Sequence, residues 1–156
     1  MRGMPNVHYI GIDLPENILV QSWYLKNTLP DRRVAFQTDA DMSDITEADA
    51  LPLRNWAIER LNLPRLDLVV NVHSFGEMNL ASLEAYFGEI VRLAPEWVFH
   101  DNLAAPRRDS LYGIPSSEYP ALPGYQLIAA CESRWPRYDP SSLYPCREQL
   151  FQRIRS

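Results

Sequence analysis

The feature that most constrains the fold is an apolar run followed at once by a polar turn and an amphipathic helix. Residues 66–72 (LDLVVNV) form the clearest apolar run, and residues 80–94 carry Leu83, Phe87 and Ile90 at helical spacing. A nearly continuous apolar run is typical of a strand covered on both faces, as in a parallel sheet. The pattern therefore predicts a strand, a turn over residues 73–79 and a helix packed on the sheet.

Further strands and helices alternate along the rest of the chain. Apolar runs predict strands, helical spacing predicts helices with apolar faces, and the last segment reads equally as a strand or a short helix. The alternation predicts an α/β fold: one domain over residues 1–156, with a mainly parallel sheet and flanking helices. The predicted strands are residues 7–12, 33–37, 97–100 and 125–130, the helices are 16–27 (inward Ile18, Leu19, Trp23 and Leu25) and 52–61 (inward Trp56 and Leu61), and the undecided segment is 146–154.

Composition excludes several classes of protein. A net charge of −5 over 156 residues argues against a broad surface for nucleic acid or anionic membranes. No apolar run reaches the roughly 18 residues of a membrane span, and no signal peptide is recognised, so the expected location is the cytoplasm. Cys131 and Cys146 fit no metal-binding pattern and are expected to be reduced thiols, and the three histidines lack the spacing of a helical zinc pair, so no metal is predicted.

Polar residues follow the predicted strands, where ligands bind in open α/β sheets. Asp13 can accept hydrogen bonds from the ribose hydroxyls of a nucleoside cofactor, or it can cap the helix that Pro15 begins. Asp39 and Asp41 follow the second predicted strand, where one of them could meet an adenine amino group or both could lie in a solvated acidic loop.

The densest polar group follows the strand of residues 66–72 and includes two candidate bases. His73 has an ordinary pKa near 6.5, which suits it to take a proton from a hydroxyl, although it could simply bond a backbone carbonyl. Glu77 could do the same if burial raised its pKa, or it could favour the start of the next helix by its charge. The other polar or aromatic members of this group are Asn71, Ser74 and Phe75.

Three residues further along are candidates for substrate binding. His100 and Asn102 follow the strand of residues 97–100, where they could meet a substrate or bond to neighbouring strand ends. Arg107 lies in a proline-containing segment, where it could pair with an anionic substrate such as a nucleotide sugar or be solvated beside Arg108.

Several of these segments resemble the bacterial sugar O-methyltransferases, which belong to the class I, Rossmann-like, S-adenosylmethionine-dependent methyltransferases. The resemblance is carried by DLVVNVHSFGEM (residues 67–78) with Tyr86 and Phe87 in the next helix, by IDLPE (residues 12–16) and by VFHDN (residues 98–102). It implies S-adenosylmethionine as the cofactor and methyl transfer to a hydroxyl of a sugar or sugar nucleotide.

The resemblance also implies roles for the candidate residues. Asp13 would hold the ribose, and the segment with Asp39 and Asp41 would edge the adenine. The reacting methyl would lie near the turn, with His73 as the first choice of base and Glu77 as the second. The cofactor-binding residues implied in that turn are Asn71, Ser74 and Phe75.

One departure from the family concerns its first strand and glycine-rich loop, for which only MRGMPN stands before residue 7. The resemblance therefore predicts an amino-terminally truncated domain with an exposed sheet edge, through which copies of the chain could associate. The alternative function is a non-catalytic fragment that acts by self-association or partner binding. A third hypothesis is a nicotinamide dehydrogenase. The absence of a glycine fingerprint weakens this hypothesis as much as it weakens the methyltransferase hypothesis.

Overall fold

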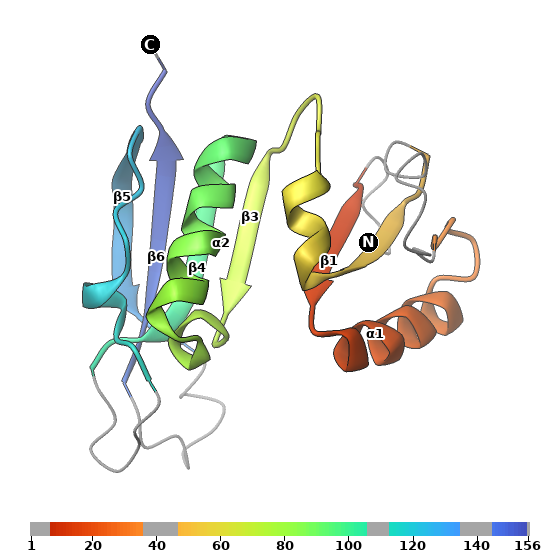
Figure 1. The fold of residues 1–156 in the computed structure, drawn as a ribbon, viewed down its shortest axis with the longest axis horizontal. Coiled ribbons are helices and arrows are strands. Elements are labelled where there is room, and N and C mark those ends of the chain that lie inside the picture. Colours follow the sequence, from red (N-terminus) through yellow and green to blue (C-terminus); the bar gives the residue numbers. More distant parts are fainter. Residues whose placement is uncertain (1–6, 36–46, 106–112, 135–144, 156) are drawn as a thin grey trace. The chain divides into compact units, whose positions relative to one another are not determined.

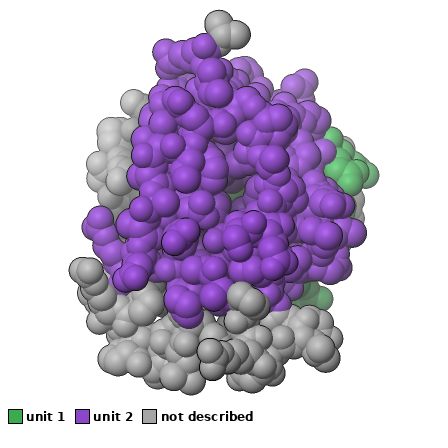
Figure 2. Space-filling model, turned by 90° about the vertical axis from the view of Figure 1, so that its left-hand side faces the viewer, with its two compact units in different colours: residues 1–61 green, residues 62–156 purple. Residues whose placement is uncertain are grey.

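The computed structural model describes residues 7–35, 47–105, 113–134 and 145–155. The chain, predicted as a single domain, forms two compact units, residues 1–61 and 62–156 (Figure 2). Among the described helices, none has the length and apolarity that a membrane crossing requires. Each unit is an α/β arrangement around its own sheet (Figure 1).

The first unit contains a two-stranded parallel sheet. Strand β1 (Tyr9–Asp13) pairs with β2 (Ala50–Arg54), and α1 (Pro15–Thr28) connects them in the sequence. Pro15 stands in the first turn of α1, where its fixed φ favours the helix and its missing N–H costs nothing. The strand β1 and the helix α1 confirm the elements predicted for residues 7–12 and 16–27.

One prediction for this unit is wrong, and a second stays a prediction. A helix was predicted for residues 52–61, but residues 50–54 form β2 and only Asn55–Arg60 form a short 3-10 helix, η2. Ala50, Leu51 and Leu53 are all buried. A strand that is buried on both faces has an unbroken apolar sequence and lacks the alternation of apolar and polar residues that identifies a half-exposed strand. The strand predicted at residues 33–37 lies partly outside the described residues, and Val34 forms a single parallel bridge to Ala50.

The apolar faces predicted for the helical segments of this unit are only partly present. Ile18 is buried in α1, as predicted, but Leu19 is 73% exposed and Trp23 is 68% exposed. In η2 and the residue after it, Trp56 is 48% exposed, whereas Leu61 is buried. Helical spacing alone therefore overestimated the width of the face that this unit covers.

The second unit contains a four-stranded sheet in the order β3-β4-β6-β5. Strands β3 and β4 are parallel, while β6 is antiparallel to both β4 and β5. Three strands therefore run in one direction and only β6 is reversed, which fits the predicted, mainly parallel sheet. The undecided segment at residues 146–154 is the strand β6. The bounds are β3 Leu68–Val72, β4 Trp97–Leu103, β5 Tyr125–Glu132 and β6 Cys146–Arg153.

Helix α2 (Leu80–Leu93) packs on one face of this sheet (Figure 1). Asn79 caps its first turn, because its side-chain Oδ1 accepts a hydrogen bond from Ser82 N at 2.9 Å. Leu83, Phe87 and Ile90 are buried against Phe75 and Val98, as their spacing predicted. This cluster is the core of the unit, and it packs α2 against β4 and against the turn after β3.

Strand β3 lies at the edge of its sheet within the described residues. Val69 packs against the core cluster, whereas Leu68, Val70 and Val72 are 48%, 57% and 50% exposed. Strands β1 and β3 belong to different sheets, one in each unit. The prediction that the chain lacks the family's first strand stays a prediction.

Candidate functional site

The candidate site begins at His73, the residue that follows β3. Its φ is 61°, a left-handed conformation that few residues other than glycine adopt without cost. Its backbone N–H donates a hydrogen bond to the carbonyl oxygen of Asp101 at 2.8 Å, which holds the turn against β4. The imidazole is 40% exposed, and its Nε2 lies 3.9 Å from Asp101 Oδ2. His73 is therefore accessible to solvent while facing a carboxylate.

Asp101 is a buried carboxylate on β4 and the partner that defines this site. Its side chain is 8% exposed, and Oδ2 accepts a hydrogen bond from Ser133 Oγ at 2.6 Å. No described residue bonds its buried Oδ1. A distance of 3.9 Å from His73 suits an ion pair rather than a hydrogen bond. Asp101 would therefore stabilise His73 once the imidazole has gained a proton.

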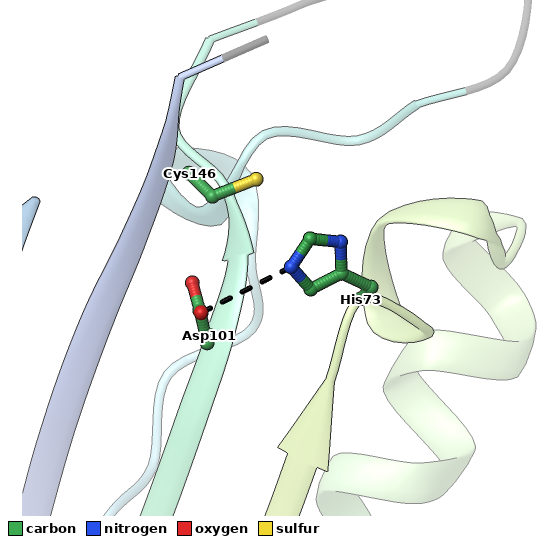
Figure 3. A group of neighbouring side chains, drawn as sticks. All are labelled: His73, Asp101 and Cys146. Atoms are coloured by element: carbon green, nitrogen blue, oxygen red, sulfur yellow. Dashed lines mark ion pairs between the residues drawn. The ribbon is translucent and has the colours of Figure 1, made fainter. Parts of the chain in front are cut away.

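Cys146, the first residue of β6, completes the group (Figure 3). One ligand atom from each of His73, Asp101 and Cys146 lies within 4.8 Å of the others. The convergence follows from strand direction, because β6 is antiparallel to β4 and its beginning lies beside the carboxyl end of β4. Cys146 is buried and is not in a disulfide.

Asn71, Ser74 and Asn102 bond to each other and to the turn after β3. Asn71 Nδ2 donates to Ser74 Oγ, and Asn71 Oδ1 accepts from the backbone of Phe75 and from Asn102 Nδ2 at 3.1 and 3.0 Å. Asn102 Oδ1 accepts from Gly76 N at 3.5 Å. Hydrogen bonds of this kind satisfy buried polar groups and fix the backbone. These side chains therefore shape the turn that presents His73.

Phe75 and His100 lie in the core of the second unit. Phe75 is 3% exposed and packs on Phe87, with ring centroids 5.3 Å apart. His100 is 2% exposed between Tyr119 and Phe151. Burial lowers the pKa of His100 to about 4, because an imidazolium without water is disfavoured, so this ring is neutral near pH 7.

This burial bears on three predicted contacts. Phe75 was predicted to touch the cofactor, and His100 and Asn102 were predicted to touch the substrate. Asn102 is fully buried, and its amide is already bonded to the turn. Because none of the three side chains reaches solvent, the structure argues against direct ligand contacts for them, and the alternative of bonding or packing inside the sheet fits better.

The remaining candidates lie elsewhere. Glu77 ends the 3-10 helix η3 (Phe75–Glu77) and is exposed. Asp13 ends β1 in the first unit, where its Oδ1 accepts hydrogen bonds from Leu14 N at 2.7 Å and Asn17 Nδ2 at 2.9 Å. The N-cap residue of α1 is Leu14, and no side chain caps the helix, so these bonds are not the predicted cap. The ribose contact stays a prediction. Three candidates lie outside the described residues: Asp39, Asp41 and Arg107.

Sequence reasoning missed three members of the site. Asp101 was visible as the residue after a predicted strand but was given no role. Ser133 and Cys146 belong to segments whose pairing the sequence did not reveal, because β6 inserts between β4 and β5. Ser133 and Cys146 come close to Asp101 and His73 only because of the order of the strands in the sheet.

Comparison with known proteins gives a likeness of fold. No protein-family model matches the chain, and no curated protein matches its sequence. The chain is similar to the crystal structure of the PH0226 protein from Pyrococcus horikoshii OT3, with a TM-score of 0.50 and 11% identity over 98% of this chain and 85% of that one. This likeness supports the predicted Rossmann-like α/β fold.

Two further solved structures are similar at lower scores. LepI in complex with SAM has a TM-score of 0.47 and 11% identity, covering 95% of this chain and 43% of that one. A protein from work on the conversion of a disulfide bond into a thioacetal group during echinomycin biosynthesis has a TM-score of 0.44 and 13% identity, covering 98% and 78%. The chain thus spans less than half the length of LepI.

Proposed function

We propose that this chain acts in S-adenosylmethionine-dependent methyl transfer to a hydroxyl group, with a sugar or sugar nucleotide as the acceptor. The observation that carries the proposal is His73, which is exposed at the carboxyl end of β3 and faces the buried carboxylate of Asp101. The Rossmann-like α/β fold is compatible with this reaction class, and the resemblance of residues 67–78 to the sugar O-methyltransferases supports it. The acceptor rests on that resemblance alone.

Proton transfer is the step that the described residues can perform. When bound, S-adenosylmethionine supplies an electrophilic methyl group on a sulfonium. Methyl transfer forms an O–C bond, breaks the C–S bond and releases the hydroxyl proton, which His73 Nε2 would accept. Asp101 would stabilise the resulting imidazolium through its charge, and burial strengthens that interaction.

The turn after β3 contributes by holding His73 in place. Its backbone is fixed by the hydrogen bond to Asp101 and by the side-chain bonds of Asn71 and Ser74. A base held in one orientation loses little entropy when substrate arrives. Glu77 is the second choice of base, because it is exposed but has no comparable fixed partner in the described residues.

Cofactor binding is proposed for Asp13 in the first unit. The carboxylate ends β1, and Oδ1 is held by Leu14 and Asn17, so the group is oriented by its neighbours. A carboxylate at the carboxyl end of a strand fits the two ribose hydroxyls of a nucleoside cofactor. Phe75, which is buried in the core, does not fit a cofactor contact in this conformation.

Calorimetric titration with S-adenosylhomocysteine tests the cofactor. We expect binding at micromolar affinity or better, lost in Asp13→Ala and kept in the control Asp31→Ala, which removes an exposed carboxylate of the same unit. No binding to the unmodified chain would refute the proposed cofactor for this chain.

Methyl transfer to a panel of sugars and sugar nucleotides tests the base. Asparagine tolerates the left-handed backbone, so His73→Asn removes the base without adding strain. We expect it to lower the transfer rate by about 10²–10⁴-fold with unchanged S-adenosylhomocysteine affinity. The control His8→Asn removes a histidine of the first unit and should leave the rate unchanged. An unaltered rate in His73→Asn would show that His73 is not the base.

Self-association is a second candidate function, favoured by the exposed apolar side chains of β3. Leu68, Val70 and Val72 are each about half exposed, and exposed edge strands pair with other chains. In sedimentation velocity at two concentrations, we expect a dimer that Val70→Lys dissociates. The control Val20→Lys changes an exposed apolar residue of α1 and should leave the dimer intact. A monomer at both concentrations would eliminate this candidate.

The cytoplasmic location stays a prediction.

A further inference from the structure

We propose that His73, Asp101 and Cys146 form a binding site for a divalent transition metal, with Zn²⁺ as the preferred ion. The three side chains point toward one another from the ends of β3, β4 and β6 (Figure 3). They offer one imidazole nitrogen, one carboxylate oxygen and one sulfur. This donor set goes beyond methyl transfer, which requires none of the three as a metal ligand.

The distances are close to those of a coordination sphere. The three ligand atoms lie within 4.8 Å of one another, and His73 Nε2 lies 3.9 Å from Asp101 Oδ2. Ligands of a tetrahedral zinc ion, bound at about 2.0–2.3 Å, lie roughly 3.3–3.6 Å apart. The ligand atoms of this group are therefore farther apart than those of a formed zinc site by a distance on the order of 1 Å. Rotations of the three side chains would close that difference when the ion binds.

A second observation, independent of the spacing, comes from Asp101. The residue is 6% exposed, and its buried Oδ1 has no hydrogen-bond partner among the described residues. A buried carboxylate oxygen without a partner costs free energy, and a cation bound by both oxygens of Asp101 would remove that cost. Ser133 bonds the other oxygen at 2.6 Å and so orients the carboxylate, as outer-shell partners do in metal sites.

The backbone around the group is held by the sheet. Asp101 pairs with Glu148 across β4 and β6, and Leu103 pairs with Cys146. Ser133 N donates to the carbonyl oxygen of Cys146 at 2.9 Å, and His73 N donates to that of Asp101. The sheet therefore holds the backbone of all three ligands.

The donor atoms select the ion. A cysteine sulfur disfavours Mg²⁺ and Ca²⁺, which prefer oxygen ligands, whereas Zn²⁺ accepts nitrogen, oxygen and sulfur together. A neutral imidazole, one carboxylate and one thiolate balance the charge of the ion. Three protein ligands also leave a fourth position open, and the exposure of His73 places that position toward solvent.

Metal binding and proton acceptance use the same Nε2 lone pair of His73. The two roles therefore exclude each other in one molecule, and a zinc ion would withdraw the base of the proposed methyl transfer. This consequence rests on the proposed function, whereas the metal site itself does not.

The test is metal titration of the purified full chain after treatment with a chelator. We expect one Zn²⁺ per chain at submicromolar Kd, measured by competition with a chromophoric chelator. With Co²⁺, we expect a thiolate-to-metal charge-transfer band. Cys146→Ser should abolish that band, and Asp101→Asn should weaken Zn²⁺ binding at least 100-fold. Cys131→Ser, which changes the exposed cysteine, should leave both unchanged.

His73→Asn provides a variant that keeps the fold, because its side chain is exposed and asparagine tolerates the backbone. It should weaken Zn²⁺ binding at least 100-fold while the circular dichroism spectrum stays the same. The proposal is refuted if the unmodified chain binds no Zn²⁺ at micromolar concentration, or if binding is unaffected in Cys146→Ser. Neither result depends on methyl transfer, so failure of the metal site and failure of the proposed reaction are distinguishable.

Discussion

Acidification should destabilise the second unit through His100, a residue that the proposed chemistry does not use. Burial lowers the pKa of this imidazole to about 4, whereas an unfolded chain returns it to its ordinary value near 6.5. Between these values the unfolded chain binds more protons than the folded one. His100 therefore contributes stability that is fully present above about pH 6.5 and is lost as the pH falls toward about pH 4.

The magnitude follows from the two pKa values. Going from about pH 7.5 to about pH 4.5, the free energy of unfolding should fall by about 2.5 kcal/mol on account of His100 alone. The residue is 2% exposed, so solvent offers little relief to the charged form. His100→Leu removes the titration while keeping an apolar side chain of similar size between Tyr119 and Phe151.

Urea denaturation at several pH values measures this difference. Trp97 begins β4 and reports on the second unit when the other three tryptophans are replaced by phenylalanine. Carboxylates elsewhere titrate equally in both proteins, so the difference between their pH profiles isolates His100. Parallel profiles for His100→Leu and its parent over this range would refute the reasoning.

Three further changes in the second unit are measurable by the same urea denaturation. Tyr119→Phe should raise the free energy of unfolding by about 1 kcal/mol, because it removes a buried hydroxyl that has no partner among the described residues; a lower stability would reveal a bond to that hydroxyl. Asn79→Ala should lower the free energy of unfolding by about 1 kcal/mol, because the cap of α2 is lost, whereas Asn79→Ser should retain the cap. Equal losses of stability in the two variants would argue against capping. Leu83→Ala should lower it by about 2–5 kcal/mol, and a loss typical of a surface position would place Leu83 outside the core.

The sequence predicted the elements of the second unit well because their patterns are distinct. Each pattern predicts one type of secondary structure. The apolar run that ends at Val72 predicts a strand, and the spacing of Leu83, Phe87 and Ile90 predicts a helix. The segment of residues 50–54 was predicted wrongly because a strand buried along its whole length shows no alternation, and length alone did not separate it from a helix.

The candidate site was predictable only as far as strand ends could be recognised. His73 follows a clear strand, so its place at the carboxyl edge could be predicted. Cys146 was assigned no role, because its place depends on the reversed direction of β6 and on its insertion between β4 and β5. Pairing between segments so far apart in the chain is a property of the whole sheet, which local patterns do not encode.

The bonds among Asn71, Ser74, Asn102 and Gly76 have a consequence for how related chains are recognised. These side chains bond to one another and to the backbone of the turn, so a chain could retain them under selection for folding alone. A shared NVHSFGE segment would then indicate a shared turn and not a shared activity.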